Sequence, residues 1–212
     1  MTSISSRALG LIVIGTVLYW SSVALAMHVL EPEFSPIRNP MSAYVVGVYG
    51  SWMSTTYVVL CAALLSVGYG LATTLARTRL TRTAFSLLLT AAAGALLAGF
   101  FPMDFPGPPQ TTSGRLHALG GALCFPAWVL GVFLFSLSVH RDRSWRKVSR
   151  ALLAISMGSI GVLLLAVLSL LVLGFAGYAQ RLLVAMLFGW MILVGNQLIR
   201  LPREQPLDGA AA

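Results

Sequence analysis

The sequence has 212 residues, of which 58% are hydrophobic and 9% are charged, and its mean hydropathy is +0.86. Soluble globular proteins carry roughly 25% charged residues, so this composition excludes the soluble class and indicates an integral membrane protein. The formal net charge of +8 does not indicate a nucleic-acid binder, because such proteins gather Lys and Arg on one face of a soluble domain. Here the basic residues stand in short gaps between apolar segments, which is the pattern of membrane topology.

Six apolar runs are separable along the chain, each close to the roughly 20 residues that a helix needs to cross a bilayer. Backbone N–H and C=O groups in hydrocarbon must be paired internally, so runs of this length form helices. We therefore predict an all-α membrane protein, a single integral membrane domain over residues 1–212 that forms a six-transmembrane-helix bundle. The predicted spans are 8–27, 50–74, 84–101, 118–139, 151–174 and 182–199. Small residues at packing intervals in the third and fifth spans predict close helix contacts, at Ala91, Ala95 and Gly99, at Gly94 and Ala98, and at Gly158 and Gly161.

The basic residues predict which end of the bundle faces the cytoplasm. One set of gaps holds 11 of the 14 Lys and Arg residues, and the other holds 3, which are Arg38, Arg115 and Arg181. Lys and Arg accumulate on the cytoplasmic side, so both chain termini are predicted to be cytoplasmic. The larger set is Arg7, Arg77, Arg79, Arg82, Arg141, Arg143, Arg146, Lys147, Arg150, Arg200 and Arg203.

The spans themselves lack Asp, Glu, Lys, Arg and His at mid-depth. Proton pumps, ion-coupled carriers and voltage sensors place ionisable groups there, so the pattern counts against those classes. A haem between transmembrane histidines is also disfavoured, because His140 belongs to the opposite end from His28 and His117.

Polar residues at the predicted outer end fall in three connections. The Pro-rich segment 105–109 of the second connection is predicted to form a compact turn, because proline lacks a donor and restricts the residue before it. Thr112 or Ser113 is predicted to cap the fourth helix. The polar residues of interest are His28, Asn39, Ser42 and Tyr44 in the first connection, Asp104, Arg115 and His117 in the second, and Tyr178, Gln180 and Arg181 in the third.

Asp104 and His117 form the candidate acid/base pair. The positive end of the fourth helix favours an ionised Asp104, and it keeps His117 neutral and able to accept a proton or bind a metal. Each residue also has a structural interpretation, Asp104 as a cap or a partner of Arg115 and His117 as a packed histidine. His28, Glu31 and Glu33 match no zinc signature, and we interpret them as a solvated loop.

Three segments carry a family resemblance: NPMSAYVVGVYG at 39–50, FPMDFPGPPQTTSGRLHAL at 101–119 and GYAQRLLVAMLFGW at 177–190. With six spans and this length, they resemble the bacterial membrane family catalogued as domain of unknown function 998, over nearly the whole chain. The most specific part is FPxD followed by GRLH, which places Asp104, Arg115 and His117. The resemblance implies a multi-pass protein of the bacterial cytoplasmic membrane, and it implies no activity.

We expect the outer mouth of the bundle to bind a lipophilic small molecule or a lipid headgroup. In this hypothesis Asp104 and His117 are catalytic, and hydrolysis, isomerisation and cyclisation all fit. Two alternatives stay open: a non-enzymatic accessory subunit or carrier, and a metal-dependent hydrolase with His28, Asp104 and His117 as ligands. The bilayer is the expected partner, and no cofactor is indicated. The predicted substrate-binding residues are Arg115 and Arg181, which would hold an anionic group, and Gln180, Tyr44, Ser42, Asn39 and His28.

Overall fold

The computed structural model describes residues 4–201, apart from the side chains of residues 172 and 173. Within this range six helices are long and apolar enough to cross a membrane. They are α1 (Ser6–Leu30), α2 (Gly50–Thr74), α3 (Arg79–Phe100), α4 (Thr112–Val139), α5 (Arg146–Leu168) and α6 (Ala176–Arg200). The connections contain the 3-10 helices η1 (Met41–Val46) and η2 (Arg143–Trp145), and the π-helix η3 (Ser169–Leu173) follows α5. The predicted all-α bundle of six membrane-spanning helices is confirmed.

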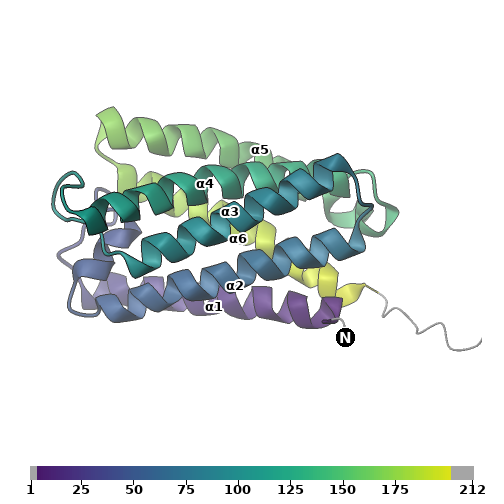
Figure 1. The fold of residues 1–212 in the computed structure, drawn as a ribbon, viewed down its shortest axis with the longest axis horizontal. Helices are drawn as coiled ribbons and strands as arrows, with labels where there is room; N and C mark the ends of the chain where they lie inside the picture. The colour runs from purple at the N-terminus through teal and green to yellow at the C-terminus, as the bar shows by residue number, and fades with distance from the viewer. Residues whose placement is uncertain (1–3, 202–212) are drawn as a thin grey trace, which may run out of the picture.

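The six helices lie side by side along the long axis of the molecule (Figure 1), and their contacts close a ring. Each helix packs against its neighbours in the chain, and α6 packs against α1. The start of α1 and the end of α6 lie at one end of the bundle, with the α2–α3 and α4–α5 connections. The other three connections lie at the opposite end, which we call the loop end. The charge pattern predicts that the loop end faces away from the cytoplasm; Arg203, which that prediction counts, lies outside the described residues.

α3 and α6 both begin before the apolar pattern does. α3 begins at Arg79, behind a capping box in which Thr78 and Thr81 exchange side-chain and backbone hydrogen bonds. α6 begins at Ala176, two residues after the left-handed Gly174. Tyr178, Gln180 and Arg181, which were predicted to lie in a connection, therefore lie on the first turns of α6.

α4 begins at Thr112, and Thr111 is its cap. The Thr111 hydroxyl accepts a hydrogen bond from the Gly114 N–H at 3.0 Å. The prediction that Thr112 or Ser113 caps this helix is therefore wrong. Ser113 instead donates to the carbonyl group of Pro102 at 2.9 Å, which ties the start of α4 to the connection before it.

α3 and α4 pack backbone against backbone. A Cβ atom at Gly94 would lie 2.7 Å from the backbone nitrogen of Cys124, and a Cβ atom at Gly120 would lie 2.6 Å from the backbone nitrogen of Ala98. Small residues permit this approach in membrane bundles, so the prediction of close packing is confirmed for α3. It is wrong for Gly161 of α5, where a Cβ atom would meet nothing within 4 Å.

α5 is the most peripheral helix of the ring. Only 17% of its most apolar window is buried, against 39–56% for the other helices. A buried polar link still joins it to the ring, because the Ser136 hydroxyl accepts from the Trp190 indole N–H at 2.8 Å and lies 3.2 Å from the Leu152 carbonyl oxygen of α5. The exposed apolar face of α5 is a surface for lipid.

The α3–α4 contact yields the first prediction. Gly120→Ala places a methyl group against backbone atoms that cannot move cheaply, so we expect it to lower the free energy of unfolding by about 1–3 kcal/mol. Gly121→Ala is the control, because its Cβ atom would meet nothing within 4 Å and alanine favours helix by up to about 1 kcal/mol. Denaturant unfolding in detergent micelles measures both, and equal effects would contradict the packing argument.

Candidate functional site

The α1–α2 connection contacts both the α3–α4 connection and the start of α6. The Phe105 ring of the α3–α4 connection lies 5.5 Å from the Phe34 ring of the α1–α2 connection, centroid to centroid. Phe34 in turn lies 5.4 Å from the Tyr44 ring. The Tyr178 N–H of α6 donates to the carbonyl group of Ile37 at 3.0 Å. Aromatic rings and a backbone hydrogen bond therefore join these segments at one end of the bundle.

Arg181 is the centre of the polar network at the loop end. Its Nη1 donates to the carbonyl oxygen atoms of Asn39 at 2.9 Å and Gly177 at 3.0 Å. Its Nη2 donates to the Tyr44 hydroxyl at 3.2 Å, and its Nε donates to His28 Nε2 at 3.0 Å. The guanidinium group therefore holds the α1–α2 connection onto α6 through uncharged partners, including three of the predicted substrate-binding residues.

His28 is fixed in one neutral form by its two hydrogen bonds. Its Nδ1 lies 2.6 Å from the carbonyl oxygen of Ala24, so Nδ1 carries the proton. Its Nε2 can then accept the hydrogen bond from Arg181. The interpretation of His28 as part of a solvated loop is wrong, because the ring is half-buried at the end of α1 with both nitrogen atoms bonded to the protein.

Glu31 is a buried carboxylate that the sequence analysis interpreted as solvated. Its side chain is 1% exposed, Oε1 accepts from the Tyr49 N–H at 2.5 Å, and Oε2 has no partner in the described chain. Gly47 packs so closely that a Cβ atom there would overlap the carboxylate. Glu31 therefore fixes the segment that follows η1. Its contacts with Gly47 and Tyr49, sixteen and eighteen residues away in the sequence, distinguish it from the exposed Glu33.

Asp104 fixes the connection that leads into α4. Its Oδ2 accepts from the N–H groups of Gln110 at 2.7 Å and Thr111 at 2.8 Å, and its Oδ1 accepts from the Thr111 hydroxyl at 2.8 Å. These hydrogen bonds, above all those from Thr111, hold the pKa of Asp104 below its usual range, because they stabilise the charged form. The Arg115 charge acts in the same direction with a smaller effect.

His117 closes the end of α3. Its Nδ1 lies 2.9 Å from the carbonyl oxygen atoms of both Ala98 and Phe101, which the end of the helix leaves without N–H partners. Nδ1 therefore carries a proton, and none of the described hydrogen bonds involves Nε2. The hydrogen bonds described for Asp104 and His117 go to different segments, and none joins the two side chains. Their predicted acid/base role stays a prediction.

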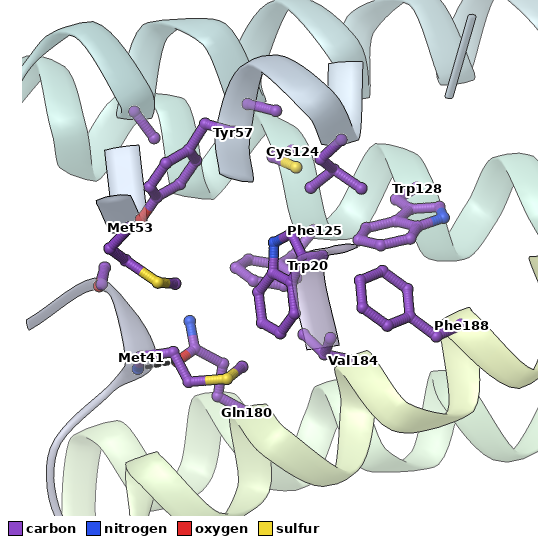
Figure 2. Close-up of a pocket in the computed structure, with 14 residues that line it drawn as sticks. Trp20, Met41, Met53, Tyr57, Cys124, Phe125, Trp128, Gln180, Val184 and Phe188 are labelled. Carbon is purple, nitrogen blue, oxygen red and sulfur yellow. Dashed lines mark hydrogen bonds between the residues drawn. The ribbon is translucent and has the colours of Figure 1, made fainter. Parts of the chain in front are cut away.

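A cavity lies inside the ring beside η1 (Figure 2). Its volume is about 40 Å³, and its lining is mostly apolar. Two predicted substrate-binding residues, Ser42 and Gln180, line it together with Tyr57 and Cys124. Asp104, His117, Arg115, Arg181, Tyr44, Asn39 and His28 are not among the lining residues, and the main apolar walls are Trp20, Met53, Phe125, Trp128, Val184 and Phe188.

The Gln180 side chain is oriented by the backbone of η1. Its Oε1 accepts a hydrogen bond from the Met41 N–H at 2.7 Å. The amide nitrogen is therefore turned the other way, and Figure 2 shows it on the cavity side of the side chain. The sequence indicated Gln180 as a binding residue, but its contact with Met41 crosses 139 residues of the chain and has no local signal.

The metal-dependent alternative lacks a ligand cluster. Among residues 4–201, no three His, Cys, Asp or Glu side chains are grouped so that they could hold a metal ion. His28, Asp104 and His117 each bond to separate parts of the loop end. We therefore do not propose metal-dependent hydrolysis.

The Arg181 network yields the second prediction. Arg181→Lys keeps the charge but loses the planar fork, so His28 and Tyr44 lose their partner and we expect a loss of at least about 2 kcal/mol in the free energy of unfolding. Arg115→Lys is the control, because Arg115 is exposed at the same end. Limited proteolysis of the α1–α2 connection, with unfolding curves, measures the difference. Equal behaviour of the two variants would contradict the role of Arg181.

The Asp104 hydrogen bonds yield the third prediction. The pKa of Asp104 is lower in the folded protein than the value of about 3.9 in an unfolded chain. Its contribution to stability is therefore present above about pH 4 and is lost as pH falls through the folded pKa. Thermal unfolding between about pH 6 and pH 2 should show a steeper loss for the wild type than for Asp104→Asn. Parallel curves would show that the carboxylate contributes nothing.

Comparison with known proteins identifies the family but no activity. The family model described as "Protein of unknown function (DUF998)" matches residues 13–196. This range reaches from α1 to α6 and includes the whole loop end. No curated protein matches the chain, and no solved structure matches it. The chain, whose helices and loop-end motifs resemble this group, therefore belongs to the DUF998 family of proteins of unknown function.

Proposed function

We propose that this multi-pass membrane protein binds a lipophilic molecule in the cavity beside η1. The observation that carries the proposal is the cavity itself, where aromatic and aliphatic side chains from α1, α2, α3, α4 and α6 surround a few polar groups. Binding sites for small molecules combine an apolar lining with a few convergent polar groups in this way. In our proposal the protein lies in the bacterial cytoplasmic membrane with the loop end outward, and the ligand arrives through the bilayer.

The size of the cavity limits what it holds in this conformation. About 40 Å³ is space for roughly three water molecules or a small chemical group. The cavity is partly open, so a larger molecule would extend beyond this interior space. We infer that one end of the ligand occupies the interior and that the rest occupies the mouth.

A carrier or accessory role is the second candidate, and one observation favours it over catalysis. The described hydrogen bonds of Asp104 and of the protonated nitrogen of His117 all go to the protein itself, and neither side chain lines the cavity. Binding without chemistry needs no acid/base pair. Turnover would instead require a substrate to reach the Nε2 atom of His117. The variants Asp104→Asn and His117→Gln separate the two roles. In a carrier, both variants should leave ligand binding intact.

The cavity yields the fourth prediction. Ala95 is 1% exposed and lines the cavity, so Ala95→Leu should fill it and displace any lipophilic molecule that copurifies with the wild type. Ala93→Leu is the control, because Ala93 is exposed on the same helix. Organic extraction of the purified proteins, followed by mass spectrometry, should show a species in wild type and Ala93→Leu that falls about tenfold in Ala95→Leu, the effect of about 1.4 kcal/mol. Equal amounts in all three proteins would contradict the proposal.

A further inference from the structure

We infer that the ligand of this cavity is uncharged and carries an acceptor oxygen, such as a ketone or ester carbonyl, which accepts a hydrogen bond from the Gln180 amide. This inference rests on the proposed function and names the chemical class of the ligand. It follows from the fixed direction of one side chain, from the absence of charge in the lining, and from the balance of donors and acceptors.

The direction of the Gln180 amide is set by the protein. The Met41 N–H occupies Oε1 at 2.7 Å, and the reverse orientation would place two N–H donors against each other. The NH₂ group therefore faces the cavity, as Figure 2 shows. The described hydrogen bonds include none from this nitrogen, so its donors are available to a ligand.

The lining of the cavity contains no Asp, Glu, Lys, Arg or His among the residues that the structure describes. A charged ligand group placed there would lose its hydration and meet no opposite charge, which is far more costly than burying a neutral carbonyl group. Arg181 follows Gln180 in the chain, but its guanidinium group is directed to His28, Tyr44 and the α1–α2 backbone. The earlier expectation of an anionic group held by Arg181 therefore does not extend to this cavity.

The balance of polar groups selects an acceptor. The hydroxyl groups of Ser42 and Tyr57 also line the cavity, and a hydroxyl group can donate or accept. The Gln180 nitrogen only donates. A ligand without an acceptor would leave this donor unpaired beside apolar walls, whereas a carbonyl oxygen would pair it.

The test uses Cys124, whose thiol lies in the cavity lining, as a reporter of occupancy. In lipid nanodiscs, the Cys61→Ala protein is alkylated with N-ethylmaleimide, and the rate at Cys124 is followed by mass spectrometry. The competing probes are methyl nonyl ketone, undecane and undecanoate. We expect the ketone to slow alkylation at a membrane concentration about fivefold lower than the concentration at which undecane has the same effect. This ratio corresponds to about 1 kcal/mol of binding free energy. We expect undecanoate to give no protection.

Gln180→Glu removes the NH₂ group but keeps an oxygen atom for the Met41 N–H, so at pH 8 it should abolish the advantage of the ketone. Gln197→Glu is the matched control, because Gln197 lies at the far end of α6 and donates to the Ser144 carbonyl oxygen at 2.7 Å. Gln180→Met serves as a second variant without donors. Size-exclusion profiles confirm that each variant is folded before the rates are compared.

Each outcome bears on a different claim. Equal protection by undecane and the ketone in wild type, or an advantage of the ketone that survives both Gln180 variants, would overturn the carbonyl inference while leaving cavity binding in place. Strongest protection by undecanoate would overturn the inference that the ligand is uncharged. A Cys124 that is alkylated at a rate no probe slows would overturn the proposed function itself. Burial in apolar surroundings makes a thiol unreactive by itself, so if Cys124 is not alkylated, the amount of each probe that the protein retains is measured instead by extraction and mass spectrometry. Equal retention by wild type and Ala95→Leu would then overturn the proposed function.

Discussion

The loop end of this protein depends on one guanidinium group. Arg181 donates to His28, to Tyr44 and to backbone carbonyl groups on both α6 and the α1–α2 connection. A planar fork with several donors can satisfy such divergent acceptors at once, which an ammonium group cannot. Because η1 belongs to the connection that Arg181 holds, the position of the cavity's polar rim follows from this network. Glu31 supports the same segment from the other side through the Tyr49 N–H.

The helices were predictable because hydrocarbon imposes a simple rule on the backbone, and the spans 50–74 and α2 coincide. The starts of α3 and α4 were less predictable, because their caps, Thr78 and Thr111, are polar residues that hydropathy assigns to loops. The cavity was not predictable at all. Its walls come from five helices and η1, and no spacing in a single sequence records which faces of those helices point inward.

In the candidate site, the type of a residue does not determine its role. Asp104 and His117 have the chemistry of an acid/base pair, yet the structure engages Asp104 with the backbone before α4 and His117 with the last carbonyl groups of α3. Both sets of hydrogen bonds pair polar backbone groups that helix ends leave without partners. The sequence shows that such residues are present at the loop end. Whether such residues stabilise a turn or act on a substrate depends on contacts that form only in the folded protein.

The closure of the ring between α1 and α6 has a consequence for biosynthesis. Gln180, Val184 and Phe188 complete the cavity, and all three come from α6, which follows the other five helices in the chain. A nascent chain that has inserted five helices has no finished pocket and still exposes the α1 face that α6 will cover. Formation of the cavity is therefore coupled to the insertion of α6, and a chain truncated before α6 lacks the wall on which the proposed ligand binding depends.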